Sequence, residues 1–132
     1  VTPTELAAFY RRAQCLVVPS RIPETFGLVG PEAMSYGTPV VAAEVGGITE
    51  WLEDGVTGLA VPPNDPAALA QAIDTLQADP AFADRLGANA RRRYFERFTP
   101  ERHADGLLRL FERVVAAARG SAPAARPEGP AP

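Results

Sequence analysis

The chain has 132 residues, of which 46% are hydrophobic and 22% charged, which suits one soluble domain with a core but not two of ordinary size. Its 13 basic residues, all arginine, are outnumbered by 16 acidic residues, and this balance argues against nucleic acid as a partner. The single cysteine, Cys15, excludes an internal disulfide, and its place in an apolar run favours a core residue over a nucleophile.

No apolar run approaches the length of a membrane span, and the start of the chain lacks the pattern of a signal peptide. We therefore expect no membrane span in this chain and a cytoplasmic location. The chain begins at Val1 in the middle of a pattern and without methionine, so we also expect a piece of a longer protein.

The first third of the chain predicts a strand between two helices. Thr4–Arg12 reads as a helix capped by Thr2 or Thr4, and Cys15–Val18 is apolar on both faces, as a parallel strand covered by helices should be. A second helix opens at or before Pro31 and stops at Gly37. We expect that helix to turn four apolar side chains inward, namely Leu28, Val29, Ala33 and Met34.

Two further strands follow. Val40–Ala43 is apolar, the glycine-rich loop Glu44–Thr49 leads to a short helix through Trp51, and turn signals precede a strand at Leu59–Val61. Strands that alternate with helices predict an α/β fold, a Rossmann-like parallel sheet with helices on both faces and right-handed crossovers.

The last third of the chain predicts three helices. Each starts at a capping residue followed by proline, at Asp65-Pro66, Asp79-Pro80 and Thr99-Pro100. The last helix carries an apolar stripe made of Leu107, Leu108, Leu110, Phe111 and Val114. We expect one lobe over residues 1–119 and a disordered tail rich in proline and alanine over residues 120–132.

The stretch Pro23–Gly37, PETFGLVGPEAMSYG, holds the candidate site. It carries two carboxylates, Glu24 and Glu32, with seven residues between them. The loops after the first and second strands emerge at the same edge of a parallel sheet, where α/β proteins bind ligands. The N-terminus of the following helix suits a phosphate, and glycines lacking a side chain let the backbone approach it closely, at Gly27, Gly46 and Gly47.

Carboxylates beside a phosphate would be repelled unless they contact something else. An ionised carboxylate only accepts hydrogen bonds, so its natural partner is a hydroxyl or a pair of hydroxyls. A ligand with phosphate and hydroxyls on both sides is a sugar nucleotide. Glu32, on the rigid helix, would then hold the ribose, and Glu24, in the loop, would lie nearer the sugar.

From about Leu6 to about Phe98, the sequence resembles the C-terminal, donor-binding lobe of retaining glycosyltransferases with the GT-B fold, the glycosyl transferases group 1 (family 4-like). The motifs that carry the resemblance are Glu24 and Glu32, Phe26-Gly27, Glu32–Met34, Gly37–Val41, Gly46-Gly47 with Glu50, Asp54-Gly55 and Thr57-Gly58. One such motif would be weak evidence, but all of them in order and in register are a strong signal.

The resemblance implies a retaining, hexosyltransferase-type enzyme that transfers a sugar from a nucleotide-diphosphate donor to an unknown acceptor, with no metal and no further cofactor. Glu24 would be catalytic by holding donor-sugar hydroxyls and stabilising charge at the reacting centre, and Glu32 would bind the ribose. Backbone amides of Phe26, Gly27 and Leu28, together with Gly46 and Gly47, would complete the donor site. The family's phosphate-binding arginine and lysine, and the N-terminal lobe, are missing from this chain, so we expect it alone to bind donor weakly and to transfer nothing.

Plainer interpretations remain open from the sequence alone. The glutamates could be solvated charges, the Gly46-Gly47 pair a simple turn, and Arg21 a surface residue rather than a phosphate ligand. The alternatives to an enzyme are a non-catalytic nucleotide-sugar-binding module and a purely structural α/β domain. Arg91–Arg93 and His103 indicate no site.

Overall fold

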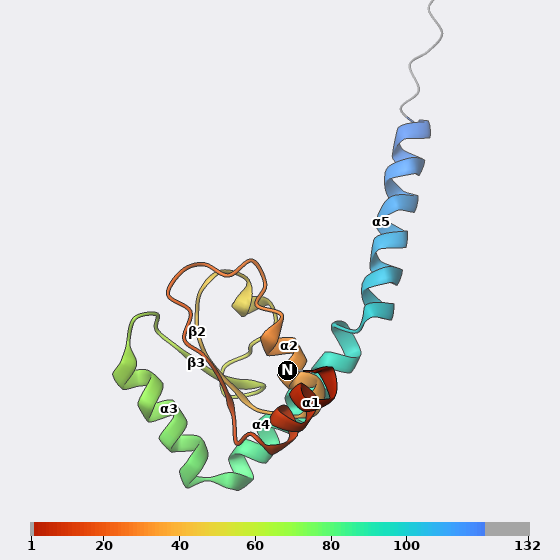
Figure 1. The fold of residues 1–132 in the computed structure, drawn as a ribbon. Coiled ribbons are helices and arrows are strands. Elements are labelled where there is room, and N and C mark those ends of the chain that lie inside the picture. Colours follow the sequence, from red (N-terminus) through yellow and green to blue (C-terminus); the bar gives the residue numbers. More distant parts are fainter. Residues whose placement is uncertain (1, 121–132) are drawn as a thin grey trace, which may run out of the picture. The chain divides into compact units, whose positions relative to one another are not determined.

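The computed structural model describes residues 2–120 (Figure 1). These residues form two units, of which the first ends at Thr99 and the second begins at Pro100. The predicted disordered tail lies outside the described residues, except for Gly120, which is the last residue of a helix.

The first unit is built on a parallel sheet of β1 (Leu16–Val18), β2 (Val40–Ala43) and β3 (Gly58–Val61) in that order. β1 begins one residue later, and β3 one residue earlier, than the sequence predicts. The apolar runs were therefore assigned correctly as strands. The predicted Rossmann-like α/β fold is confirmed.

The central strand buries both of its faces, as the sequence predicts. Val40 and Ala42 pack into one cluster, whereas Val41 packs into another with Leu76 and Leu86. These three β2 side chains are 0% exposed, and Ala43 at the end of the strand is 3% exposed. This two-sided burial is the property that separates a parallel strand covered by helices from the half-buried strand of an open sheet.

One face of the sheet is covered by α1 (Pro3–Arg12), α2 (Val29–Tyr36) and the 3-10 helix η1 (Gly46–Glu50). α1 starts with a reciprocal capping box, in which Thr2 and Glu5 each accept a hydrogen bond from the other's backbone. The left-handed backbone of Gly37 (φ +78°) ends α2, and returns the chain to β2.

The opposite face is covered by α3 (Pro66–Ala78), and α4 (Pro80–Arg97) packs on both α2 and α3 (Figure 1). Asp65 and Asp79 cap these helices by accepting hydrogen bonds of 2.9 Å from the amides of Ala68 and Phe82. Both proline-based start signals are therefore confirmed.

The predicted inward face of α2 is wrong in part. Ala33 and Met34 are fully buried, but Leu28 is 71% exposed and Val29 is 44% exposed. The helix begins only at Val29, so Leu28 is its cap, and Gly30 and Pro31 take the inward positions of the first turn. Gly30 lies so close to the ring of Trp51 that any side chain there would overlap it.

The second unit contains α5 (Pro100–Gly120), which is described by itself. Its large apolar side chains are 40 to 60% exposed, namely Leu107, Leu108, Leu110, Phe111, Val114 and Val115. Within residues 2–120, no helix is both long and apolar enough to cross a membrane.

Candidate functional site

The loop after β1 and the segment after β2 meet at the carboxyl edge of the sheet. The backbone N–H of Gly47 donates to the carbonyl oxygen of Glu24 over 2.8 Å. A side chain at Gly46 would overlap the Glu24 backbone, and one at Gly47 would overlap the carbonyl of Thr25. The glycine pair is thus more than a turn, because only residues without a side chain let the two segments touch.

Trp51 fixes the next part of the loop. This side chain is 0% exposed, and its indole N–H donates to the carbonyl oxygen of Phe26 over 2.6 Å. Gly27 adopts a left-handed backbone (φ +73°) against the same indole ring. Trp51 is therefore a core residue that also fixes the loop.

The backbone amides of this fixed loop are left without acceptors. Within residues 2–120, the N–H groups of Phe26, Gly27 and Leu28 donate to no backbone or side-chain oxygen. The first intrahelical bonds of α2 are made further along, by Gly30 to Gly27 and by Glu32 to Leu28. Three consecutive unpaired amides, one of them on a left-handed glycine, are hydrogen-bond donors that an anion could accept from.

Glu24 and Glu32 lie at the two ends of this amide run, and each accepts one hydroxyl hydrogen bond. Ser20 Oγ donates to Oε1 of half-buried Glu24 over 2.7 Å, and Tyr10 OH donates to Oε2 of exposed Glu32 over 3.1 Å. The second oxygen of each carboxylate has no partner within residues 2–120. Each glutamate therefore keeps an oxygen that can accept a hydrogen bond from a ligand.

Sequence reasoning missed both hydroxyl donors. Ser20 lies only four residues before Glu24, so its hydroxyl could have been considered from the sequence. Tyr10 is 22 residues from Glu32 on another helix, and no local pattern joins them. Burial, and then the neighbouring Glu32 carboxylate, raise the pKa of Tyr10 to about 12. The phenol is therefore a hydrogen-bond donor at neutral pH.

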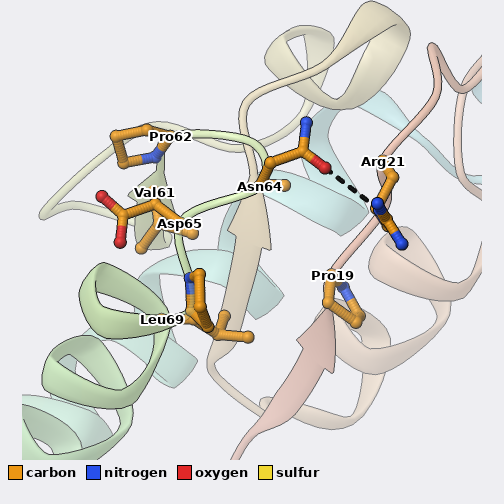
Figure 2. A pocket seen from close by; sticks show the side chains of 9 residues that line it. Pro19, Arg21, Val61, Pro62, Asn64, Asp65 and Leu69 are labelled. Atoms are coloured by element: carbon orange, nitrogen blue, oxygen red, sulfur yellow. Dashed lines mark hydrogen bonds between the residues drawn. The ribbon is translucent and has the colours of Figure 1, made fainter.

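A separate pocket of about 350 Å³ opens beyond the ends of the three strands, on the side of α3 (Figure 2). Its lining includes Pro19, Ala43, Val61 and Leu69, but neither Glu24 nor Glu32. Arg21 and Asn64 also line this pocket, and Arg21 Nε donates to Oδ1 of Asn64 over 3.0 Å. This pocket therefore does not contain the two glutamates of the predicted donor site.

Positive charge is scarce at this edge. Among the loops that follow β1, β2 and β3, at residues 19–28, 44–57 and 62–65, Arg21 is the one cationic side chain. Other arginines are used in the fold, as when Arg93 pairs with Glu53 over 2.7 Å. These loops therefore offer backbone amides and a single cationic side chain to an anionic ligand.

The other chemistry-bearing residues form no site. Cys15 is half-buried, and burial raises the pKa of its thiol, the opposite of what a nucleophile needs. His103 lies exposed on α5. The part of the chain that the structure describes holds no group of three or more His, Cys, Asp or Glu side chains that could bind a metal ion.

Comparison with known proteins identifies relatives. The family Glycosyl transferases group 1 matches residues 1–93. The chain is 49% identical over 89 residues to the D-inositol 3-phosphate glycosyltransferase of Streptomyces bingchenggensis, a match that covers 67% of this chain and 19% of that protein. D-inositol 3-phosphate glycosyltransferase 1 of Catenulispora acidiphila is 44% identical over 116 residues, which cover 88% of this chain and 27% of that protein. The chain thus spans less than a third of the length of these relatives.

Solved structures give the same result. Sucrose-phosphate synthase from Thermosynechococcus elongatus superposes with a TM-score of 0.81 at 44% identity, covering 89% of this chain and 29% of that one. Anabaena HepE, solved in complex with UDP-glucose, superposes with a TM-score of 0.67 at 36% identity, covering 68% of this chain and 25% of that one. The matched motifs, the parallel sheet and these relatives together show that the chain belongs to the glycosyl transferases group 1, as a C-terminal portion of a GT-B fold.

Proposed function

We propose that this chain supplies the donor-binding half of a retaining glycosyltransferase, which moves a hexosyl group from a nucleotide-diphosphate sugar to an acceptor. Two kinds of relative support the proposal: the curated relatives are named as glycosyltransferases, and Anabaena HepE binds UDP-glucose. The acceptor would be bound by the remainder of the protein. The name D-inositol 3-phosphate glycosyltransferase, which several relatives carry, suggests a phosphorylated polyol as the acceptor class.

The observation that carries the proposal is the run of unpaired amides at Phe26, Gly27 and Leu28 between two half-satisfied carboxylates. Amides bind a diphosphate without adding charge, and carboxylates accept hydrogen bonds from sugar hydroxyls. In this assignment Glu32 binds the ribose diol and Glu24 binds the sugar to be transferred. Gly46 and Gly47 support the site by holding the Glu24 backbone in place.

In the proposed reaction, the bond between the anomeric carbon and the donor phosphate oxygen breaks. The acceptor oxygen then bonds to the same carbon from the same face, and the departing phosphate oxygen takes the acceptor's proton. Positive charge that develops on the sugar would be stabilised by the negative Glu24 carboxylate. Metal independence and a cytoplasmic location stay predictions.

The alternative is a non-catalytic module that binds nucleotide sugars. It would use the same amides and carboxylates, so binding alone does not separate the two. Turnover does: we expect donor binding by this chain but no sugar transfer, and transfer by the longer protein. A longer protein that binds donor and transfers nothing would favour the module.

The donor site is tested by titrating the chain with UDP-glucose, GDP-mannose and ADP-glucose and following amide resonances by NMR. Because one arginine serves the whole edge, we expect weak binding, with a dissociation constant on the order of 1 mM. Glu32→Gln should weaken binding of the preferred donor about tenfold, since a charged acceptor is lost. Glu96→Gln, an equivalent change at an exposed glutamate on α4, should have no effect. Equal affinity of the Glu32→Gln variant and the unmodified chain would refute the assigned role.

A further inference from the structure

We propose that Tyr10 is a positioning residue for the donor: its hydroxyl holds Oε2 of Glu32, so that Oε1 is presented to the ribose diol. The inference rests on the proposed function of Glu32 and adds to it a residue outside the predicted site. It begins from the 3.1 Å hydrogen bond between the Tyr10 hydroxyl and the Glu32 carboxylate.

The phenol is held from several directions. Tyr10 is 7% exposed, and its ring stacks on the ring of Tyr36 with centroids 5.4 Å apart and planes within 14°. The Arg11 guanidinium lies 5.1 Å above the other ring of the pair, that of Tyr36. Thr38 Oγ1 donates to the carbonyl oxygen of Tyr10 over 2.8 Å, in a buried contact. The donor atom is therefore fixed before any ligand arrives.

The carboxylate, in contrast, is exposed and sits on a side chain with three rotatable bonds. Such a side chain loses rotamer freedom when a ligand orders it, and that loss weakens binding. A fixed hydroxyl at one oxygen reduces the loss because the carboxylate is already confined. The packing of α1 on α2 thus places the Tyr10 hydroxyl where it confines Glu32, and the ligand loses less free energy in ordering this side chain.

A phenol suits this role better than a cation. An arginine at this position would neutralise Glu32 and would compete for both of its oxygens. A neutral hydroxyl occupies a single oxygen and leaves the negative charge that attracts ribose hydroxyls. The high pKa of Tyr10, caused first by burial and then by Glu32, keeps the hydroxyl protonated under all physiological conditions.

The same device occurs at the other carboxylate, where Ser20 donates to one oxygen of Glu24 over 2.7 Å. A purely structural link between α1 and α2 would not need the hydroxyl, because the stacked rings already join these helices. The hydroxyl adds a contact to one atom, and that atom belongs to the carboxylate that we assign to the ribose.

The experiment compares UDP, ADP and GDP with their 2′,3′-dideoxy forms, which lack the diol, by NMR titration of the chain. In the unmodified chain, the preferred nucleotide should bind more tightly than its dideoxy form. Tyr10→Phe keeps the ring and its stack, and we expect it to weaken the ribonucleotide about three- to tenfold without affecting the dideoxy form. Tyr36→Phe is the matched control, because its hydroxyl has no hydrogen-bond partner within residues 2–120.

Three results would overturn the inference, each recognisably. If Tyr10→Phe weakens both nucleotides equally, the residue acts only on the fold. If it changes neither affinity, the hydroxyl does not position Glu32. If it still weakens the ribonucleotide in a Glu32→Gln background, it does not act through Glu32. Failure of the proposed function looks different: the unmodified chain would then fail to distinguish the two forms, or would bind no nucleotide.

Discussion

The loop between β1 and α2 and the helix α5 each present groups without partners, but the groups are of opposite kinds. The loop is held by the hydrogen bond from the Trp51 indole to the Phe26 carbonyl oxygen. Its backbone amides and one oxygen of each glutamate carboxylate stay available. α5 leaves six large apolar side chains exposed along its length. Unpaired polar groups indicate a polar ligand, whereas an exposed apolar face indicates an apolar partner surface. From this difference we expect a polar ligand at the loop and an apolar contact along α5, and the predictions below test each expectation.

The largest expected effect comes from Trp51→Ala. This change removes a fully buried ring and its hydrogen bond to Phe26, so we expect a loss of about 3–5 kcal/mol in the free energy of unfolding. Leu108→Ala in α5 removes a side chain that is 60% exposed, and should cost about 0.5 kcal/mol or less. Denaturant unfolding measures both values. Similar losses for the two variants would remove the distinction between the regions.

Gly46→Ala should have the next largest effect. The new methyl group would overlap the Glu24 backbone at a left-handed position (φ +53°), so we expect a loss of about 2–4 kcal/mol in the free energy of unfolding. Gly55→Ala is the matched control, because Gly55 has a similar φ of +69° but no atom within 4 Å of the added carbon. It should lose only about 1 kcal/mol. Equal losses, measured by denaturant unfolding, would show that the contact between the two loops contributes nothing.

Ser20→Ala sharpens the assignment of Glu24. Without the 2.7 Å hydrogen bond, Glu24 is less confined, and we expect UDP-glucose to bind about three- to tenfold more weakly while UDP is unaffected. Ser35→Ala is the control, since that hydroxyl donates to the backbone of Glu32 and not to a carboxylate. NMR titration measures each affinity. An equal loss for UDP and UDP-glucose would mean that Glu24 does not contact the sugar.

The smallest effect concerns the titration of Tyr10. Burial is the main cause of its pKa of about 12 and Glu32 the second, so Glu32→Gln should lower the pKa but leave it above 10. Since the folded pKa lies above the unfolded one, this tyrosine's contribution to stability is complete below pH 10 and declines between pH 10 and 12. The phenol-carbon resonance of Tyr10, followed against pH, gives the value. An unchanged pKa in the variant would contradict the hydrogen bond.

Local patterns were sufficient to predict most of the fold. Apolar runs bounded by proline and glycine located β2, and the capping aspartates located the starts of α3 and α4. The inward face of α2 was predicted less well, because Leu28 caps the helix instead of belonging to it, and Gly30 and Pro31 take the buried positions of the first turn. The close packing of Gly30 against Trp51 joins residues that are distant in sequence, so no local pattern reveals it.

The candidate site residues were selected by residue type, whereas the contacts between them were not predicted. Both glutamates and the glycine pair could be selected from their order in the chain. The hydrogen bonds from Tyr10 to Glu32 and from Trp51 to Phe26 span 22 and 25 residues, so no periodicity reveals them. These long-range contacts decide which amides and oxygens stay available. The roles assigned to Glu24, Phe26, Gly27, Leu28 and Glu32 stay predictions.

The most direct measurement is an amide-resolved NMR titration of the chain with UDP-glucose. We predict that the largest shift changes fall on Phe26, Gly27 and Leu28, with smaller ones around Glu32. Changes centred instead on Arg21 and Asn64 would place the ligand in the pocket of Figure 2. That result, or a complete absence of change at the three amides, would contradict the donor site.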